Sequence, residues 1–292
     1  MKPLAFIAIP GLLLAALPAW LASLGGAADH DSAGRIVAVN LRASWIADGD
    51  LLELARLPQL ERLDLSRTRI SDQGLGYLKT ATSLRDVNLS FAEKIGDPAH
   101  AIIKHWKNLR RLNLRGTVVA DATAAAAASL PHLEALDVTD TQVGDAGLEQ
   151  LALARELKDL AIGNLRLTDL GFQSLRQLTG LVILDLAGRR PAIGGVMEMS
   201  AQAVEALASL RGLRVLRLGH VKFPVKSLAI LKTMPNVESL SLAFCPEIRD
   251  AAIAYLADWK SLRLVDLHGT KMTAEGVASL RKQRPYCKFL WE

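Results

Sequence analysis

The chain has 292 residues, of which half are apolar and only 5% aromatic, so its core must be built from Leu, Val, Ile and Ala. The formal charge of +5 is modest for this length, and the basic residues are scattered among 30 acids. Because nucleic-acid binding needs basic residues gathered in a stripe, this composition argues against a nucleic-acid partner.

Residues 1–27 contain one early cation, Lys2, followed by an apolar run over residues 4–24 and then small residues. This order is typical of an export signal, and we expect cleavage after Ala27. About twenty apolar residues also suffice to span a bilayer, so an uncleaved inner-membrane anchor is the alternative. Two prolines in the run favour the signal. Either way the rest of the chain is expected to be exported, periplasmic or secreted, behind a short linker at residues 28–35.

From Ile36 onward the chain repeats the pattern L-x-x-L-x-L-x-x-T-x-I-x-D-x-x-L-x-x-L. The alternating apolar positions at its start predict a short strand, and those that follow have helical spacing. One copy cannot bury its own apolar face, so the copies must stack on one another. Most spacings are 24 residues, two are 25 and one is 32, as the ten starting positions show: Ile36, Leu60, Leu84, Leu109, Leu133, Leu157, Leu181, Leu213, Val237 and Leu262.

This pattern resembles the leucine-rich repeat, in its cysteine-containing form known from F-box proteins and from bacterial proteins of unassigned role. The resemblance covers residues 36–292, although only Cys245 has cysteine at the characteristic ninth position. It implies an α/β fold, a right-handed solenoid of about ten strand–helix repeats over residues 36–285 with a parallel sheet on its concave face. No F-box-like segment precedes Ile36, so a ubiquitin-ligase role is not implied.

Residues 286–292 repeat the strand spacing and are expected to form a C-terminal capping strand. Three aromatic residues would occupy its inward positions: Tyr286, Phe289 and Trp291. The same register places Cys245 two repeats before Cys287, which separates them by roughly 10 Å or more because adjacent strands are about 4.8 Å apart. A disulfide needs Cα atoms within about 7 Å. We therefore expect two free thiols.

Three polar columns follow the repeat. The ninth-position threonines are expected to satisfy backbone groups of the next coil rather than to act as nucleophiles. A second column suits the positive end of each helix: Asp48, Asp72, Asp97, Asp121, Asp145, Asp169 and Asp250. The fifth position predicts a hydrogen-bonded ladder, with a bound cation as the alternative: Asn40, Asp64, Asn88, Asn113, Asp137, Ala161, Asp185, Arg217, Ser241 and Asp266.

Signatures of catalysis are missing from the sequence. There is no G-x-S-x-G, Walker or G-x-G-x-x-G motif, and the histidines lack metal-ligand spacing. A glycine pair in "AIGGV" is too weak a signal for a phosphate loop. We therefore expect no catalytic residue, no metal, no cofactor and no enzymatic activity.

The repeat that begins at Leu181 is eight residues longer than the others, and the surplus falls in residues 187–200. Insertions in such arrays map to loops on one face, often the binding face. A loop folded over the flank with half-buried apolar residues is the alternative. We expect a contact surface here that combines apolar, arginine and aromatic residues: Ile183, Asp185, Arg189, Arg190, Ile193, Met197, Arg214, Val215, Arg217, His220, Phe244 and His268.

Together these features predict a non-catalytic binding or scaffold module of the cell envelope or exterior. We expect a monomer that holds a protein partner, or a glycan, on its concave face and strand-end loops, with membrane contact only through an uncleaved N-terminal segment. Two alternatives remain at this point: a secreted effector that engages host proteins, and a purely structural envelope protein. Since fold alone does not define function, the site must decide.

Overall fold

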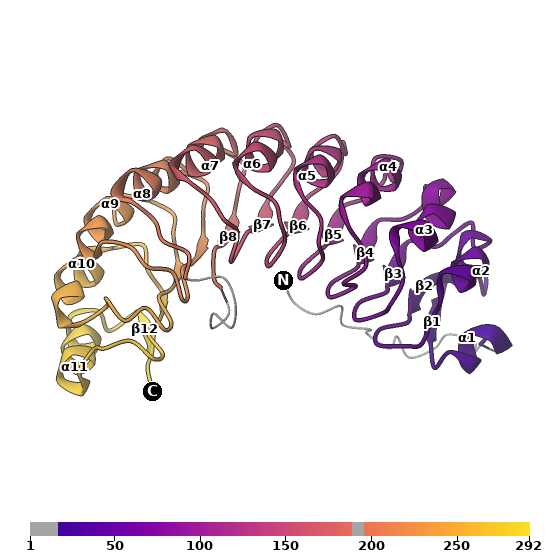
Figure 1. Ribbon diagram of the computed structural model, residues 1–292. Coiled ribbons are helices and arrows are strands. Elements are labelled where there is room, and N and C mark those ends of the chain that lie inside the picture. The colour runs from indigo at the N-terminus through magenta and orange to yellow at the C-terminus, as the bar shows by residue number, and fades with distance from the viewer. Residues whose placement is uncertain (1–16, 189–195) are drawn as a thin grey trace. The chain divides into compact units, whose positions relative to one another are not determined.

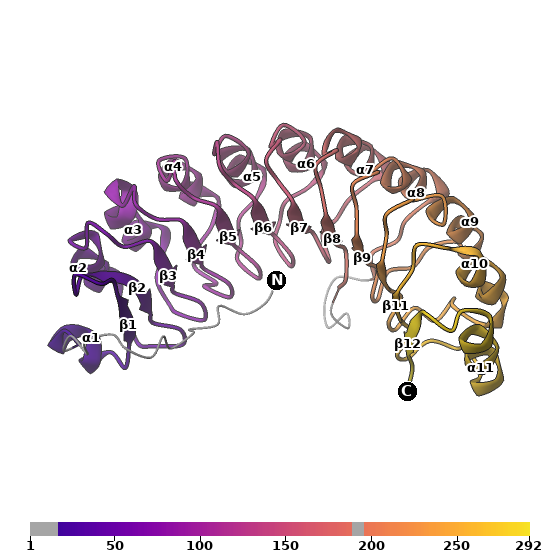
Figure 2. The ribbon, with the colours of Figure 1, turned by 180° about the vertical axis from the view of Figure 1, so that it is seen from behind.

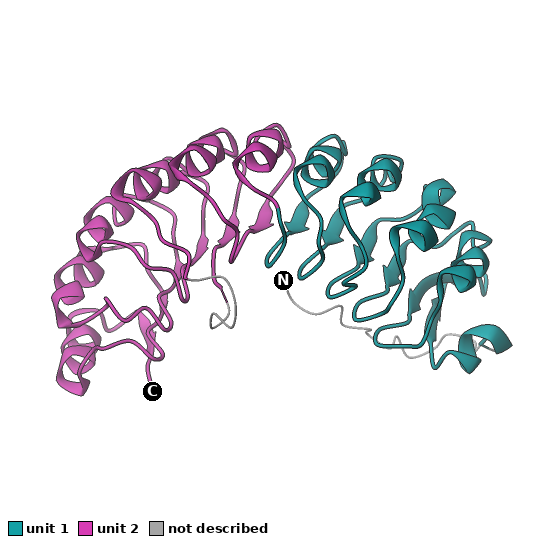
Figure 3. Ribbon diagram, in the orientation of Figure 1, with its two compact units in different colours: residues 1–142 teal, residues 143–292 magenta. Residues whose placement is uncertain are grey.

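The computed structural model describes residues 17–188 and 196–292. The chain divides into two compact units, Met1–Gln142 and Val143–Glu292 (Figure 3). In each unit, strands line one side and helices the other, and each strand is followed by its helix (Figures 1 and 2). The predicted α/β repeat fold is confirmed.

In the N-terminal unit the strands pair in chain order, and β2 to β6 are parallel. The strands are β1 (Ala27–His30), β2 (Ile36–Asn40), β3 (Arg62–Asp64), β4 (Asp86–Asn88), β5 (Arg111–Asn113) and β6 (Ala135–Asp137). The helices are α1 (Ala19–Ser23), α2 (Leu51–Ala55), α3 (Asp72–Leu75), α4 (His100–Ile103) and α5 (Asp121–Ala128).

The C-terminal unit repeats this arrangement with parallel strands in chain order. Its strands are β7 (Asp159–Ala161), β8 (Ile183–Asp185), β9 (Val215–Arg217), β10 (Ser239–Ser241), β11 (Leu264–Asp266) and β12 (Lys288–Leu290). Its helices are α6 (Asp145–Leu151), α7 (Asp169–Ser174), α8 (Ala201–Ala208), α9 (Leu228–Leu231), α10 (Ile253–Asp258) and α11 (Ala274–Gln283).

Each coil is built in the way the repeat predicts. Leu60, Leu63 and Leu65 are fully buried, because alternation along β3 turns them to the helix side. After most strands of the repeats the eighth residue adopts a left-handed backbone conformation, which ends the strand and starts the return to the helix; Gly188 after β8 does not. Residues of many types occupy this position: Ala43, Arg67, Phe91, Gly116, Asp140, Asn164, His220, Phe244 and Gly269.

The ninth-position threonines satisfy backbone groups, but those of their own coil rather than the next one. Thr68 donates to the carbonyl oxygen of Leu65 at 2.7 Å, and Thr117 donates to that of Leu114 at 2.6 Å. Cys245 differs, because its Sγ lies 3.1 Å from the carbonyl oxygen of Leu218 in the preceding coil. Both cysteines are free and buried, as expected.

The aspartates at the helix starts do more than face a positive helix end. Their carboxylates accept hydrogen bonds from the residue that caps the next helix, and so tie successive coils together. Asp48 accepts from the backbone N–H of Ser71 at 2.8 Å and from its hydroxyl at 2.6 Å. Asp250 accepts in the same way from Thr273 at 2.9 and 2.7 Å. These bonds hold the pKa of the Asp250 carboxyl below its ordinary value.

The fifth-position side chains form the expected ladder only in part. Asn88 donates to Asp64 of the preceding strand at 3.1 Å, whereas most members of the column accept from a backbone N–H two residues later. Asp64, for example, accepts from Ser66 N at 2.8 Å. The column therefore shapes the turn after the strand first and links strands second.

The N-terminal end differs from the expected linker at residues 28–35. Residues 27–30 form β1, which pairs antiparallel with β2, and α1 precedes it. Leu21 of α1 is fully buried, and a Cβ at Gly26 would lie 2.4 Å from Leu21 Cδ1. This close packing explains the glycine. The segment covers the open edge of β2, a structure that the apolar pattern of an export signal did not predict.

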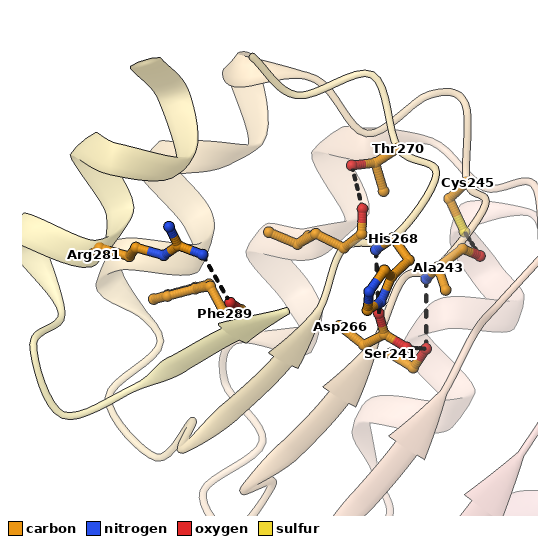
Figure 4. Close-up of polar contacts among 9 residues, drawn as sticks. Ser241, Ala243, Cys245, Asp266, His268, Thr270, Arg281 and Phe289 are labelled. Carbon is orange, nitrogen blue, oxygen red and sulfur yellow. Dashed lines mark hydrogen bonds and ion pairs between the residues drawn. The ribbon is translucent and has the colours of Figure 1, made fainter. Parts of the chain in front are cut away.

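The C-terminal strand β12 pairs in parallel with β11. Phe289 is buried, and Arg281 donates to its carbonyl oxygen at 3.3 Å (Figure 4). Tyr286, expected to point inward, is 86% exposed, while its neighbour Cys287 is buried. Trp291 is half-buried.

Candidate functional site

The sheet of the C-terminal unit carries an apolar pair at the third position of the repeat, which is the first residue of β8 and of β9. Ile183 of β8 and Val215 of β9 are direct register partners, and both are half-buried. Their neighbours Leu184 and Leu216 are fully buried on the opposite face. Strand alternation therefore presents the apolar pair, Ile183 and Val215, on the outer face of the sheet.

A charged pair lies beside the apolar pair, two residues further along the same strands. Arg217 donates to Asp185 Oδ2 at 3.1 Å, and both side chains are partly exposed. Arg214 lies at the start of β9, where its guanidinium is 3.7 Å from Glu238 and largely exposed. The apolar pair is thus bordered by arginines whose charges are matched.

The turn after β9 and the turn after β10 bring two rings together. His220 and Phe244 stack with centroids 4.7 Å apart and planes at 6°. Both residues have the left-handed backbone of the eighth position, and Phe244 is 46% exposed. Next to the ring of Phe244 lies Gly269, where a Cβ would be 2.4 Å from Phe244 Cδ1. The stack presents a flat aromatic edge at the strand ends.

A polar cluster connects β10, β11 and the turn after β11 (Figure 4). His268 Nδ1 lies 2.6 Å from Asp266 Oδ1, and the hydroxyl of Ser241 donates to Asp266 Oδ2 at 3.2 Å. Since the serine is bonded to the carboxylate and not to the imidazole, this cluster lacks the serine–base contact that activates a nucleophile.

Cys245 lies behind this surface. Burial raises the pKa of its thiol to about 12, and the Sγ contacts the carbonyl oxygens of Leu218 and Val221 at 3.1 and 3.3 Å. A neutral, buried thiol is a poor nucleophile. Cys245 therefore holds the backbone of the preceding coil in place.

The prediction for the insertion was wrong at Met197. Met197 and Met199 are 7% and 3% exposed, because the returning segment pairs with Lys222 of the next coil. Lys222 N donates to Met197 O at 2.9 Å, and Met199 N donates to Lys222 O at 2.8 Å. Met197 belongs to the core rather than to a contact surface. Three further predicted site residues lie outside the described residues: Arg189, Arg190 and Ile193.

The structure brings the remaining predicted residues onto one sheet and its strand-end turns: Ile183, Asp185, Arg214, Val215, Arg217, His220, Phe244 and His268. Ser241 and Asp266 join them and were not among the predicted site residues. Both were present in the fifth-position column, so the signal existed. The hydrogen bond between them is one rung of the ladder that this column predicts.

Within residues 17–188 and 196–292, no group of three or more His, Cys, Asp or Glu side chains is placed to hold a metal ion. Over the same ranges, no helix has the length and hydropathy needed to cross a membrane.

Comparisons with known proteins agree with the geometry. Residues 57–79 and 129–152 match a family model described as a leucine-rich repeat. The leucine-rich-repeat ectodomain of the Arabidopsis receptor kinase HAESA, solved with a peptide hormone ligand, is similar at 18% identity and a TM-score of 0.57. The match covers 84% of this chain and 40% of that one, so the chain spans about two fifths of the receptor's length.

A second similar structure is the same receptor with the hormone and a co-receptor, at 19% identity and a TM-score of 0.55, again covering 84% and 40% of the two chains. A leucine-rich-repeat protein of Leptospira interrogans is 16% identical with a TM-score of 0.50, covering 82% and 68%. At these identities the likeness concerns the fold. A search of curated proteins finds no match.

Proposed function

Because the chain is a leucine-rich-repeat protein, we propose that it is a non-catalytic binding module that holds a protein partner on the sheet of its C-terminal unit. The contact surface that we propose consists of the apolar pair, its bordering arginines and the ring stack: Ile183, Val215, Asp185, Arg214, Arg217, His220 and Phe244.

The observation that carries this proposal is the apolar pair with its polar border. Ile183 and Val215 are exposed enough to be covered, and Asp185 and Arg217 already neutralise each other at 3.1 Å. Protein interfaces favour this arrangement, with apolar and aromatic residues at the centre, arginine nearby and a polar rim. An arginine paired with an acid costs less to bury than an unpaired one, since its charge is not left uncompensated.

The class of partner follows from the same surface. The plant receptor ectodomain of similar fold was solved with a peptide hormone, and the surface here offers side-chain contacts rather than a metal or a deep polar site. We therefore propose a protein or peptide segment. A glycan would be the contrary result of the test below.

We also propose that the protein acts in the cell envelope or outside the cell. The support is the sequence of residues 1–24, a cation followed by an apolar run. Because Leu21 is fully buried and β1 begins at Ala27, cleavage after Ala27 would remove core contacts. We propose that residues 17–30 stay with the mature chain, either through cleavage before residue 17 or through retention of the whole segment as an anchor.

Site-specific crosslinking in cells tests the binding proposal. A photoreactive amino acid at Val215 is expected to give a covalent adduct with a protein. The matched control is the same probe at Leu170, which is 74% exposed on α7 of the same unit, and it is expected to give none. Adding Phe244→Ala and Arg217→Glu should abolish the adduct at Val215. Equal adducts at both positions, an adduct that is a glycan, or an unchanged adduct in the variants would contradict the proposal.

The insertion has its own test. Deleting residues 190–195 leaves Met197 and Met199 in the core, so the deletion variant should keep its thermal stability. If the insertion contributes to binding, the Val215 adduct falls in this variant. An unchanged adduct removes the insertion from the proposed contact surface and leaves the rest of the proposal standing.

A further inference from the structure

The strand-end turns of the N-terminal unit carry a second surface, distinct from the one proposed above. Arg67 lies over the ring of Phe91, 5.1 Å from its centroid, and Arg69 lies over the ring of Trp45 at 5.5 Å. One turn therefore reaches in both directions, since Arg67 extends to the following coil and Arg69 to the preceding one. We call these four residues the arginine–aromatic edge.

The edge is open to solvent. Trp45 is 83% exposed, Arg67 and Arg69 are exposed, and Phe91 is half-buried against Gly116. Large apolar side chains gain from being covered, and here Trp45 and Phe91 lie on neighbouring sides of one turn rather than singly. The left-handed backbone at Arg67 and Phe91 costs further energy and fixes the direction in which both side chains leave the chain.

The two arginines differ from most other arginines of this unit, which form ion pairs with acids. Arg62, Arg85 and Arg110 pair with acids at 2.9, 3.6 and 2.5 Å. Over the described part of the chain, the side chains of Arg67 and Arg69 make no ion pair, and rings are their partners. The edge is therefore basic, with one acid among the charged residues of its turns: Arg42, Arg67, Arg69, Glu93 and Lys94.

The chemistry of a guanidinium that lies over a ring defines what it binds. The ring attracts the cation, while the guanidinium N–H groups can still donate two parallel hydrogen bonds to a carboxylate. A membrane surface needs no such fixed geometry, because mobile lysines attract anionic lipids equally well. A sugar stacks on a bare ring, but Arg69 covers a face of Trp45, and Phe91 lies between Arg67 and Gly116.

We propose that the arginine–aromatic edge binds an acidic peptide segment of a partner protein, with its carboxylates on Arg67 and Arg69 and its apolar atoms against Trp45. This inference goes beyond the function proposed above, since it concerns the other unit. Loss of the Val215 crosslink would leave it untouched, and its own failure would leave the Val215 crosslink untouched.

Fluorescence anisotropy of the full chain with a fluorescein-labelled poly-glutamate peptide tests the proposal. We expect saturable binding that weakens about tenfold for each arginine removed, as charge-assisted hydrogen bonds are lost, in Arg67→Gln, Arg69→Gln and the double variant. The matched control is Arg85→Gln with Arg110→Gln, which makes the same change in charge at paired arginines of the same unit. It should weaken binding less than about twofold.

A lysine variant separates geometry from charge. Arg67→Lys with Arg69→Lys keeps both charges but removes the planar fork, and we expect it to bind several-fold more weakly than the natural chain. Absent binding, full affinity in the lysine variant, equal losses in the Arg85 and Arg110 control, or tighter binding to anionic phosphatidylglycerol vesicles or polygalacturonate than to the peptide would each overturn the proposal. Melting temperatures should stay unchanged in all variants, because the substituted side chains are exposed.

Discussion

The repeats at residues 84–108 and 237–261 are the two that span 25 residues, one in each unit, and they are built alike. Each has phenylalanine at the eighth position and a fully buried tryptophan near its end. Each is followed by a repeat with glycine at the eighth position, against which the phenylalanine ring lies. The matching pairs are Phe91 with Phe244, Trp106 with Trp259, and Gly116 with Gly269.

The differences between these repeats lie in what surrounds the shared residues. Arg67 covers Phe91, whereas His220 covers Phe244. Trp106 donates from Nε1 to the carbonyl oxygen of Leu78 at 2.9 Å, whereas Trp259 Nε1 has no hydrogen-bond partner among the described residues. The comparison teaches that a phenylalanine and a glycine in consecutive turns form one structural unit. The residue that lies over the phenylalanine ring differs between the two repeats, and this difference gives each unit its own surface chemistry.

The largest expected effects concern the two tryptophans. Replacing either by alanine should lower the free energy of unfolding by about 3–5 kcal/mol, since both are fully buried. Replacement by phenylalanine should have a different cost in unfolding free energy at the two tryptophans. Trp106→Phe removes one of the two hydrogen bonds that the Leu78 carbonyl accepts, the other coming from Ala81 N at 3.0 Å, and should cost about 1 kcal/mol more than Trp259→Phe, which removes an unpaired N–H. Urea unfolding measures the difference, and equal costs would show that Trp259 has a partner in solution.

The glycines are expected to give the next largest effects. Gly116→Ala and Gly269→Ala place a Cβ on a left-handed backbone and within 2.5 and 2.4 Å of a phenylalanine ring, so each should cost about 1–2 kcal/mol or more. Gly116→Ala should cost more, because Phe91 is less exposed than Phe244 and less free to swing away.

Thermal unfolding of a double-mutant cycle checks the cause of the glycine effect. Gly116→Ala should cost less in a Phe91→Ala background, where no ring meets the new methyl group. Gly76→Ala is the control, since this glycine is helical and nothing lies within 4 Å of its Cβ position. If the cycle is additive, the ring contact is not what requires glycine.

The smallest expected effect concerns the ninth position of these two repeats, which is Ala92 in one and Cys245 in the other. The folded pKa of Cys245 is raised to about 12, so between pH 9 and 12 the unfolded chain loses the thiol proton while the folded chain keeps it. Stability should therefore fall as pH rises through this range, by about 1 kcal/mol from pH 9 to 10. Cys245→Ala, which copies Ala92, should have a flatter alkaline dependence. Identical pH profiles for the two proteins would contradict the buried, neutral thiol.

Most of the fold was predictable because it is carried by single-residue periodicity. The spacing of Leu60, Leu63 and Leu65 recurs along the chain. Aligning the repeats by this spacing predicts which residues of neighbouring strands pair. The segment of α1 and β1 was not predicted because Leu21 and its neighbours carry an apolar pattern that suits an export signal equally well. The burial of Met197 was not predicted because an insertion does not follow the repeat, so the repeat assigns none of its residues to the core.

The candidate site was predictable only where a column carries one kind of side chain. Ile183 and Val215 are both apolar, and their pairing follows from the repeat. The Arg67–Phe91 and Arg69–Trp45 contacts also join equal repeat positions of neighbouring coils, but the residue type at these positions changes from coil to coil. Their geometry depends on side-chain directions set by a left-handed turn, and the repeat pattern does not mark that turn with any one residue type.

The aspartate ties between coils are not continuous. Each needs a carboxylate at the start of a helix, as in Asp169, which accepts from the Ser200 hydroxyl at 2.7 Å. The next two helical segments begin with Ala201 and Val225, which have no oxygen to offer. The coils of β8, β9 and β10 therefore lack this aspartate tie between successive helices. Between the β8 and β9 coils, the backbone hydrogen bonds of Lys222 with Met197 and Met199 join the two coils instead.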